Sequence, residues 1–310
     1  MNETPAQRSV LHGLEFGVGC WAWGDRLVWG YGRGYAADTV RQAFDASVAA
    51  GIELYDTAEV YGQGQSELLL GEFLKTVDRK LIIATKFMPY PWRLRRGSLV
   101  RALRGSLKRL GLEQVDLYQV HQPLAPVTVE TWMAAMSEAV QLGLTHEVGV
   151  SNYDRSWTQR AFDALAREGI PLASNQVEYS LINRKIEKNG LLKQCQELGV
   201  RLIAYSPLGM GMLTGKYTPQ NLPSGIRAGR YNARFIERMT PLLTLIKRIG
   251  SDHDGKTPAQ VALNWVICKG ALPIPGAKNL SQAEQNAGAL GWRLTEEEVA
   301  ALDEASDKLG

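Results

Sequence analysis

Short apolar runs alternate with longer amphipathic stretches along most of this chain. The runs at 51–55, 81–85, 116–120 and 201–205 are rich in aliphatic and aromatic residues, which is typical of buried strands. Further strands are expected near 16–20, 147–150, 174–177 and 272–274. The stretches between them have apolar positions at helical spacing, and we expect helices over 37–50, 65–75, 99–110, 128–142, a segment ending at 168, 191–198 and 258–269.

Strand and helix thus alternate through eight units, which predicts a parallel sheet with right-handed crossovers. Eight units favour closure of that sheet. The predicted fold class is therefore α/β, a (β/α)8 TIM barrel, with accessory helices at 233–249 and 296–308. A length of 310 residues is ordinary for one such barrel, so residues 1–310 are expected to form a single domain. Residues 8–14 are expected to form a hairpin or a cap before the first strand.

Composition and charge exclude several classes of partner. The formal net charge of +3 is too small to indicate nucleic acid, and a cluster of arginines between 93 and 104 is expected to be a solvated helix start, with an anionic-ligand site as the alternative. Neither a targeting segment nor an apolar run of membrane-spanning length is visible, so we expect no membrane partner and a cytoplasmic protein. Three widely spaced cysteines without metal-ligand patterning indicate a reducing compartment and no metal.

Ionisable residues directly follow three of the predicted strands. Asp56 follows the run at 51–55, Lys86 the run at 81–85 and His121 the run at 116–120, whereas Tyr61 lies in the loop beyond Asp56. The carboxyl ends of barrel strands meet at one mouth, where such barrels carry their chemistry. Four residues able to move or steer a proton are therefore expected to converge there.

Each of these four residues has a structural alternative. A strand-end aspartate is often a helix N-cap, a lysine a solvated charge, a tyrosine a core residue and a histidine a satisfied polar group. Four of them in matching contexts favour a proton-transfer site. His12, His146 and His253 have no such partners and are expected to be structural.

A set of motifs in fixed order resembles the aldo-keto reductase family. The motifs are Asp56-Thr57-Ala58-x-x-Tyr61-Gly62, Ala84-Thr85-Lys86, Tyr118-Gln119-Val120-His121, Gly149-Val150-Ser151-Asn152, Tyr205-Ser206-Pro207-Leu208 and Pro275-Gly276-Ala277-Lys278. Each motif alone is weak, whereas the ordered set, from about Gly17 to Asn286, is highly specific.

The resemblance implies an NADPH-dependent reductase of aldehydes and ketones, in which Tyr61 is the general acid. A tyrosine has an ordinary pKa of about 10, and a neighbouring ammonium such as that of Lys86 lowers it. Asp56 would hold Lys86 charged and oriented. His121 would donate a hydrogen bond to the carbonyl oxygen of the substrate.

No dinucleotide fingerprint is present, and the glycines at 209–215 lack the spacing of an ATP-binding loop, so these motifs do not identify the cofactor site. The contacts with the cofactor are instead those that the resemblance implies. Ser151, Asn152 and Gln176 would bind the nicotinamide carboxamide, and Tyr205 would stack on the ring. Lys278 would pair with the adenosine 2′-phosphate. Ser206, Leu208 and Gly211 would surround the pyrophosphate, and Gln282 and Asn286 would bind the adenosine end. Many relatives have arginine at position 278 and glutamate at 285, and lysine lacks the bidentate geometry of arginine.

An aromatic, glycine-rich segment at 21–35 is expected to be a loop over the barrel mouth, with packing of the loop to the barrel as the alternative role of its tryptophans. The substrate pocket is expected to be lined by Trp21, Trp23, Trp29, Tyr90 and Trp92, which favours flat or apolar carbonyl compounds. The loop is similar to that of plant pyridoxal reductases, so pyridoxal is one expected substrate; the similarity would also arise from loop packing alone.

Two rival functions stay open at this stage. Channel β subunits resemble the same family, so the chain would alternatively be an NADPH-binding redox sensor. A Schiff-base aldolase on the same barrel would use Lys86 as its nucleophile. For the reductase and for the aldolase alike, the expected partner is a small carbonyl compound. The protein is expected to be a monomer.

Overall fold

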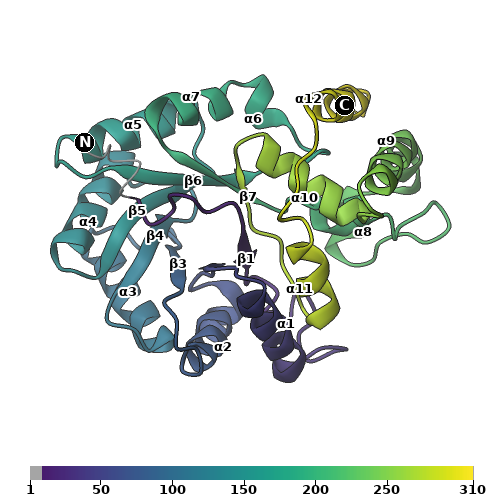
Figure 1. Cartoon of the computed structure of the whole chain (residues 1–310). Coiled ribbons are helices and arrows are strands. Elements are labelled where there is room, and N and C mark those ends of the chain that lie inside the picture. The colour runs from purple at the N-terminus through teal and green to yellow at the C-terminus, as the bar shows by residue number, and fades with distance from the viewer. Residues whose placement is uncertain (1–8, 310) are drawn as a thin grey trace.

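The computed structural model describes residues 9–309, and within them eight parallel strands form one sheet in the order β1 to β8 (Figure 1). This sheet is a nearly closed barrel, which confirms the predicted (β/α)8 fold. The strands are β1 (Gly17–Gly19), β2 (Leu54–Asp56), β3 (Ile82–Phe87), β4 (Val115–Val120), β5 (Thr145–Ser151), β6 (Leu172–Glu178), β7 (Arg201–Tyr205) and β8 (Leu272–Pro273).

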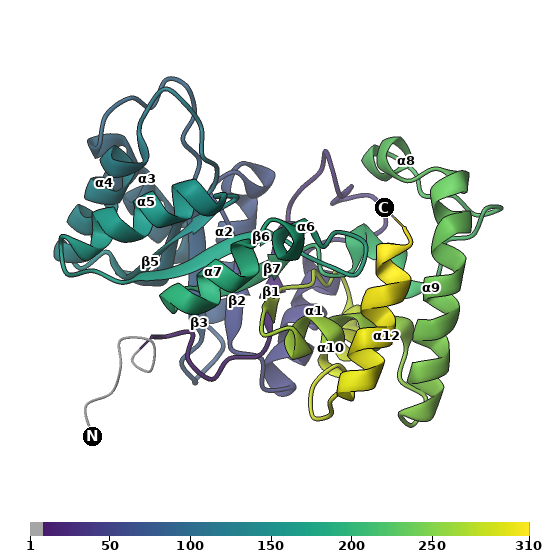
Figure 2. The same cartoon turned by 90° about the horizontal axis from the view of Figure 1, so that it is seen from above.

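Helices surround this barrel, and most begin and end close to the residues expected from helical spacing. They are α1 (Ala37–Ala49), α2 (Gln65–Leu74), α3 (Gly97–Leu110), α4 (Val129–Gln141), α5 (Arg155–Ala166), α6 (Lys185–Lys188), α7 (Leu191–Leu198), α8 (Ile226–Arg230), α9 (Ala233–Asp252), α10 (Pro258–Cys268), α11 (Leu280–Ala287) and α12 (Glu296–Asp307). The accessory helices α9 and α12 lie side by side outside the barrel (Figure 2). Within residues 9–309, no helix has the length and apolar character needed to cross a membrane.

Alternation along the strands separates two hydrophobic compartments. Leu54, Ala84 and Leu117 point into the barrel, where they pack with Ala173, Ile203, Leu272 and Ile274. Their neighbours Tyr55 and Tyr118 belong instead to the larger core between the sheet and the helices. Successive side chains of a strand point to opposite faces, so each strand contributes to both compartments.

The inward face of each strand changes from apolar to polar toward its carboxyl end. Two residues beyond an inward apolar residue, the same face presents Asp56 after Leu54, Lys86 after Ala84 and Gln119 after Leu117. Ser151, Gln176 and Tyr205 occupy the corresponding ends of β5, β6 and β7. A period of two therefore stacks a polar layer on top of the apolar interior.

The barrel closes between β1 and the end of β8 through a close backbone approach at Gly19. The Gly19 N–H donates to the Pro275 carbonyl at 3.1 Å. A Cβ at this position would lie 2.7 Å from the carbonyl oxygen of Ile274. Only glycine fits there without displacing the backbone of the neighbouring segment.

A turn over residues 9–13 covers the amino-terminal end of the barrel, which agrees with the cap and not with the hairpin among the two expected structures for 8–14; residue 8 lies outside the described residues. Leu11 inserts into the apolar interior. Ser9 Oγ and the Val10 N–H both donate to the Glu147 carboxylate, at 2.9 and 3.0 Å. The turn therefore acts as a plug.

We expect Gly19→Ala to destabilise the protein by about 1–3 kcal/mol, because the added methyl overpacks the β1–β8 closure. Gly97→Ala at the start of α3 is the matched control, since a Cβ there meets no atom within 4 Å. It should be neutral or slightly stabilising. Urea denaturation of both variants measures the difference, and equal stabilities would contradict the closure argument.

Candidate active site

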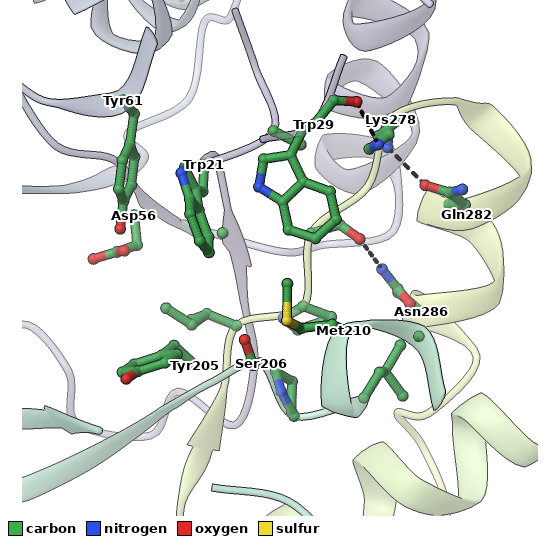
Figure 3. Close-up of a pocket in the computed structure, with 18 of the residues that line it drawn as sticks. Trp21, Trp29, Asp56, Tyr61, Tyr205, Ser206, Met210, Lys278, Gln282 and Asn286 are labelled. Atoms are coloured by element: carbon green, nitrogen blue, oxygen red, sulfur yellow. Dashed lines mark hydrogen bonds between the residues drawn. The ribbon is translucent and has the colours of Figure 1, made fainter. Parts of the chain in front are cut away.

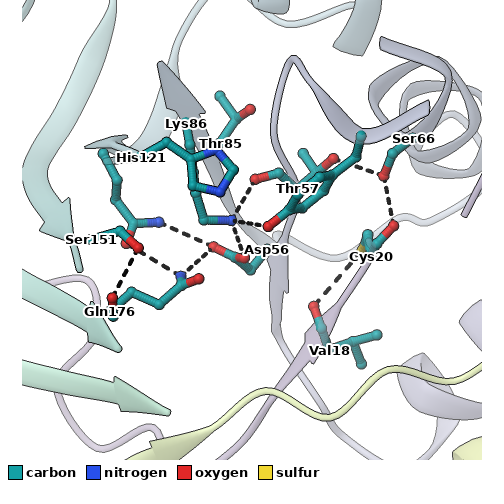
Figure 4. Close-up of polar contacts among 12 residues, drawn as sticks. Val18, Cys20, Asp56, Thr57, Ser66, Thr85, Lys86, His121, Ser151 and Gln176 are labelled. Carbon is teal, nitrogen blue, oxygen red and sulfur yellow. Dashed lines mark hydrogen bonds and ion pairs between the residues drawn. The ribbon is translucent and has the colours of Figure 1, made fainter. Parts of the chain in front are cut away.

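A buried ion pair between Asp56 and Lys86 lies at the centre of the polar layer (Figure 4). The Lys86 side chain is fully buried, and that of Asp56 nearly so. The Lys86 ammonium donates to the Asp56 carboxylate, to the Thr57 carbonyl at 2.8 Å and to the Tyr61 hydroxyl oxygen at 3.2 Å. An ammonium has three protons, so all of its donors are used.

The Tyr61 hydroxyl accepts this bond, and its own proton has no acceptor among residues 9–309. The Lys86 Nζ also lies 4.8 Å from the centroid of the Tyr61 ring. Tyr61 is placed by the loop after β2, where Gly62 has φ of 56° and passes too close to the Gly24 carbonyl to allow a Cβ. The phenolic proton is thereby available to the pocket.

The electrostatics correct one expectation from the sequence. Burial raises the pKa of the Tyr61 phenol, and the Lys86 ammonium opposes this rise without cancelling it. Burial also disfavours the charge on Lys86, but Asp56 and Tyr61 outweigh it and raise the Lys86 pKa. Tyr61 is therefore a neutral phenol and Lys86 a cation at neutral pH, as a proton donor and its supporting charge should be.

His121 follows β4 and faces the Tyr61 ring edge-on, with 5.6 Å between the ring centroids. Burial, with the Lys86 charge adding to it, lowers the His121 pKa to about 3. Its Nδ1 is buried and has no partner within the described residues. A neutral imidazole at this position can donate a hydrogen bond without adding a second positive charge beside Lys86.

Two amides complete the surroundings of Asp56. Gln119 and Gln176 each donate to the second carboxylate oxygen, at 3.0 and 2.9 Å, while Lys86 occupies the first. The Gln176 Nε2 also lies 3.3 Å from the Gln119 Oε1. Both carboxylate oxygens are thus satisfied inside the protein, which a buried charge requires.

A cavity of about 460 Å³ opens above these residues (Figure 3). Its lining includes Asp56, Tyr61 and His121 at one end and Lys278 at the other. All ten residues assigned to a cofactor line it, namely Ser151, Asn152, Gln176, Tyr205, Ser206, Leu208, Gly211, Lys278, Gln282 and Asn286. The ends of seven strands, or the segments that follow them, therefore contribute to one cavity; β3 is the exception.

Asn152 and Tyr205 form a rigid part of the cavity wall. The Tyr205 hydroxyl donates to Asn152 Oδ1 at 2.9 Å, and Asn152 Nδ2 donates to the His121 carbonyl at 3.1 Å. Asn152, Ser206 and Met210 all have positive φ, between 50° and 62°. Non-glycine residues held in this conformation cluster at ligand sites, because binding surfaces retain backbone strain that folding would otherwise avoid.

Cations converge at the far end of the cavity. Lys278 precedes α11, which carries Gln282 and Asn286 one turn apart, and the Gln282 Oε1 accepts from the Lys278 backbone N–H at 2.9 Å. Lys216 and Arg227 line the same end. Burial lowers the Lys278 pKa to about 8, with Arg227 and Lys216 adding to the effect. Three basic residues close enough to repel one another form a site suited to phosphate groups.

The aromatic residues expected in the substrate wall separate into two groups. Trp21 and Trp29 line the cavity, and Trp21 stacks on Tyr61 at 5.9 Å. Tyr90 and Trp92 stack on each other outside the lining, and Trp92 is 73% exposed.

Trp23 does not line the cavity, which corrects the sequence-based assignment. Its side chain is fully buried against Phe44, Tyr55 and Phe73, and its Nε1 donates to the Ala277 carbonyl at 2.8 Å. The loop sequence gives no sign of this, because residues 21–29 form turns and bends without a regular period that would separate inward from outward side chains.

Sequence reasoning missed Gln119, Lys216 and Arg227. Gln119 could have been found, because it lies two residues before His121 on the inward face of β4. Lys216 directly follows the glycine-rich stretch at 209–215, of which only Gly211 was assigned to the cofactor. Arg227 is on α8, which is too short to show a period.

The cavity fits a nicotinamide dinucleotide phosphate by its own chemistry. Three cations suit its phosphates, and the amide and hydroxyl groups beside Tyr205 suit its carboxamide. Among residues 9–309, no group of three or more His, Cys, Asp or Glu side chains could hold a metal ion.

Comparisons with known proteins agree with this geometry. The model of the Aldo/keto reductase family matches residues 15–307. The chloroplastic pyridoxal reductase of Arabidopsis thaliana is 43% identical over 303 residues, covering 94% of this chain and 82% of that protein.

Two solved structures have the same architecture. A thermostable aldo-keto reductase crystallised with the inhibitor epalrestat has a TM-score of 0.79 at 31% identity, covering 98% of this chain and 100% of that one. An aldo-keto reductase of Klebsiella pneumoniae, crystallised with NADPH, has a TM-score of 0.72 at 28% identity, covering 94% and 90% of the two chains.

We expect Asp56→Asn to destabilise the protein by about 3–5 kcal/mol, because it leaves the Lys86 ammonium buried without a counter-charge. Asp45→Asn is the matched control, since Asp45 pairs with Arg41 on the surface of α1 and is 52% exposed. That change should cost at most about 1 kcal/mol. Chemical denaturation near pH 7 compares the two, and a small effect of Asp56→Asn would show that the pair contributes little.

His121 should make stability depend on pH. Its folded pKa of about 3 lies below the ordinary value of 6.5, so the unfolded chain binds more protons between these values and stability falls as the pH falls through that window. From pH 7 to pH 5 this one group should cost up to about 2 kcal/mol. The loss should be smaller by that amount in His121→Asn. An unchanged pH dependence in the variant would mean that His121 does not remain neutral.

Proposed function

The chain belongs to the aldo/keto reductase family and is an NADP-dependent oxidoreductase, and from this premise we propose that it reduces aldehydes and ketones to alcohols with Tyr61 as the general acid. The observation that carries the proposal is the direction of one hydrogen bond. The Tyr61 hydroxyl accepts from the buried Lys86 ammonium, which leaves the phenolic proton for a substrate in the cavity.

Four residues would each have a separate role in the reduction of the carbonyl group. Bound NADPH supplies a hydride to the carbonyl carbon of the substrate. As negative charge develops on the carbonyl oxygen, Tyr61 Oη donates its proton there, and His121 donates a hydrogen bond that positions the same oxygen. Lys86 then stabilises the tyrosinate that remains. Its charge lowers the free energy needed to remove a proton from a phenol whose pKa is raised by burial. Asp56 keeps Lys86 charged throughout.

Cofactor assignment follows the two ends of the cavity. Ser151, Asn152 and Gln176 would hold the nicotinamide carboxamide, with Tyr205 against the ring. Ser206, Leu208 and Gly211 would surround the pyrophosphate, and Gln282 and Asn286 the adenosine. Lys278, together with Lys216 and Arg227, would bind the 2′-phosphate, which gives the preference for NADPH.

The substrate is best described as an aromatic or apolar aldehyde. Trp21 stacks on Tyr61 and meets Trp29 edge-on at 5.5 Å, so the space beside the proton donor has an aromatic wall. The name of the Arabidopsis relative makes pyridoxal the first candidate to test. We further propose, from the resemblance to the family, that the protein acts as a cytoplasmic monomer; the plant relative is named as chloroplastic.

Of the two rival functions, the aldolase is disfavoured by the state of Lys86. A Schiff-base lysine must lose its proton to become a nucleophile, whereas the pKa of Lys86 is raised and all three of its donors are used. A sensor of the channel β-subunit type would bind NADPH and turn over little or nothing, so turnover itself separates that function from a reductase.

We expect Tyr61→Phe to lower kcat/KM by about 100- to 10,000-fold, the usual contribution of a general acid, with NADPH affinity nearly unchanged. NADPH oxidation would be followed with pyridoxal, 4-nitrobenzaldehyde, an aliphatic aldehyde and a sugar aldehyde. Tyr90→Phe is the matched control, because Tyr90 lies outside the cavity lining. Full activity of Tyr61→Phe would remove the proton-donor assignment, and tight NADPH binding without turnover by the wild type would favour the sensor.

A further inference from the structure

Lys278, the residue assigned to the 2′-phosphate, is already engaged by the loop over the mouth. Its Nζ donates to the Trp29 carbonyl at 3.1 Å and lies 4.7 Å from the centroid of the Trp29 ring. It also lies 4.6 Å from the centroid of the Tyr35 ring. Figure 3 shows Trp29 between Trp21 and Lys278. The ammonium is therefore held by two aromatic rings and a carbonyl of one loop.

Trp29 connects this cation with the catalytic end of the cavity. Its ring meets Trp21 edge-on at 5.5 Å, and Trp21 in turn stacks on Tyr61. Arg227 lies on the Trp29 ring as well, at 5.8 Å from the centroid. A movement of Trp29 would therefore change both the cation cluster and the wall beside the proton donor.

The backbone of the loop is hydrogen-bonded on both sides of Trp29, since the Tyr31 N–H donates to the Asp25 carbonyl and the Gly32 N–H to the Tyr35 carbonyl, both at 2.9 Å, so it is the Trp29 side chain that depends on these contacts. Asp25 accepts from Trp21 Nε1 at 3.1 Å and from the Val28 N–H at 2.8 Å. Tyr35 donates to the Ala22 carbonyl at 2.7 Å. Trp29 Nε1, by contrast, is buried and has no partner within the described residues. Trp29 is thus kept in place through its carbonyl and its ring faces.

A phosphate would compete with the Trp29 carbonyl and the two aromatic rings for the Lys278 ammonium, which now donates one of its three protons to that carbonyl. A cation–π contact and a bond to a neutral carbonyl are each weaker than a charge-assisted bond to a phosphate dianion. A phosphate would also relieve the repulsion of Lys278 by Arg227 and Lys216, which adds to the effect of burial in lowering the Lys278 pKa.

We propose that Trp29 is a specificity-determining residue that senses the 2′-phosphate: Lys278 holds the loop through Trp29 until the phosphate takes over the ammonium, and Trp29 then shifts beside Trp21. This inference rests on the proposed function. NADH lacks the 2′-phosphate, so it leaves Lys278 on Trp29 even when its other contacts form. The position of Trp29 beside Trp21 would therefore differ between the NADPH-bound and NADH-bound protein, in addition to any difference in affinity for the two cofactors.

The test uses the full-length protein labelled with 5-fluorotryptophan and observed by fluorine NMR. The Trp29 resonance is assigned by its loss in Trp29→Phe. Trp157 is the matched control, because it has Arg160 at 5.7 Å from its ring and lies outside the cavity. The protein is titrated with NADP⁺, NAD⁺, adenosine 2′,5′-bisphosphate and adenosine 5′-monophosphate, and calorimetry establishes saturation independently.

We expect NADP⁺ and adenosine 2′,5′-bisphosphate to shift the Trp29 resonance, whereas saturating NAD⁺ and adenosine 5′-monophosphate leave it near its free position. The Trp157 resonance should not move. In Lys278→Met, the Trp29 shift with NADP⁺ should fall toward the value seen with NAD⁺, because the cation that contacts both the Trp29 carbonyl and its ring is gone and only Arg227 remains at that ring.

Three results would overturn the inference. An equal Trp29 shift with saturating NAD⁺ and NADP⁺ would show that Trp29 responds to the nucleotide as a whole. An unmoved Trp29 resonance in protein saturated with NADP⁺ would show that the contact with Lys278 persists. Absence of binding by either dinucleotide would instead remove the proposed function, and the inference with it.

Discussion

The buried charge pair of Asp56 and Lys86 is the constraint on which the arrangement of this barrel mouth depends. Transfer of two ions from water into a protein costs several kcal/mol for each ion, and their attraction offsets this only when the remaining donors and acceptors are satisfied. That requirement explains the neighbours. The Thr57 carbonyl and Tyr61 hydroxyl complete Lys86, and Gln119 and Gln176 complete Asp56. The hydrogen bond from Lys86 to the Tyr61 hydroxyl is therefore needed for the buried ion pair to be stable, and not only for the proposed reaction.

The cavity combines a rigid catalytic end with a phosphate end whose cations are held less firmly. Around Asn152 and Tyr205 the polar atoms bond to one another, and the backbone retains positive φ angles. At the far end Lys278, Lys216 and Arg227 meet without a carboxylate among the lining residues there. The hydrogen-bonded, strained backbone thus lies at the end where the proposed mechanism transfers a proton, and the excess positive charge lies at the end where a phosphate would balance it.

The sequence predicted what depends on periodicity and on strand ends. Asp56, Lys86 and His121 could be placed because each terminates an apolar run, and the barrel followed from the alternation of such runs with amphipathic stretches. Trp23 was misplaced because loops have no period that tells an inward ring from an outward one. The direction of the Tyr61 pKa was wrong, since burial outweighs the neighbouring charge and burial is a property of the whole fold. Arg227 and α11 were missed because short helices carry too little pattern.

The plug formed by residues 9–13 limits how ligands reach the polar layer of the barrel. With Leu11 filling the amino-terminal end of the barrel interior, the catalytic layer is reached from the opposite mouth, where the cavity opens. A nucleotide and a carbonyl compound would therefore have to share this one mouth. Whichever of the two binds deeper would have to enter first and leave last.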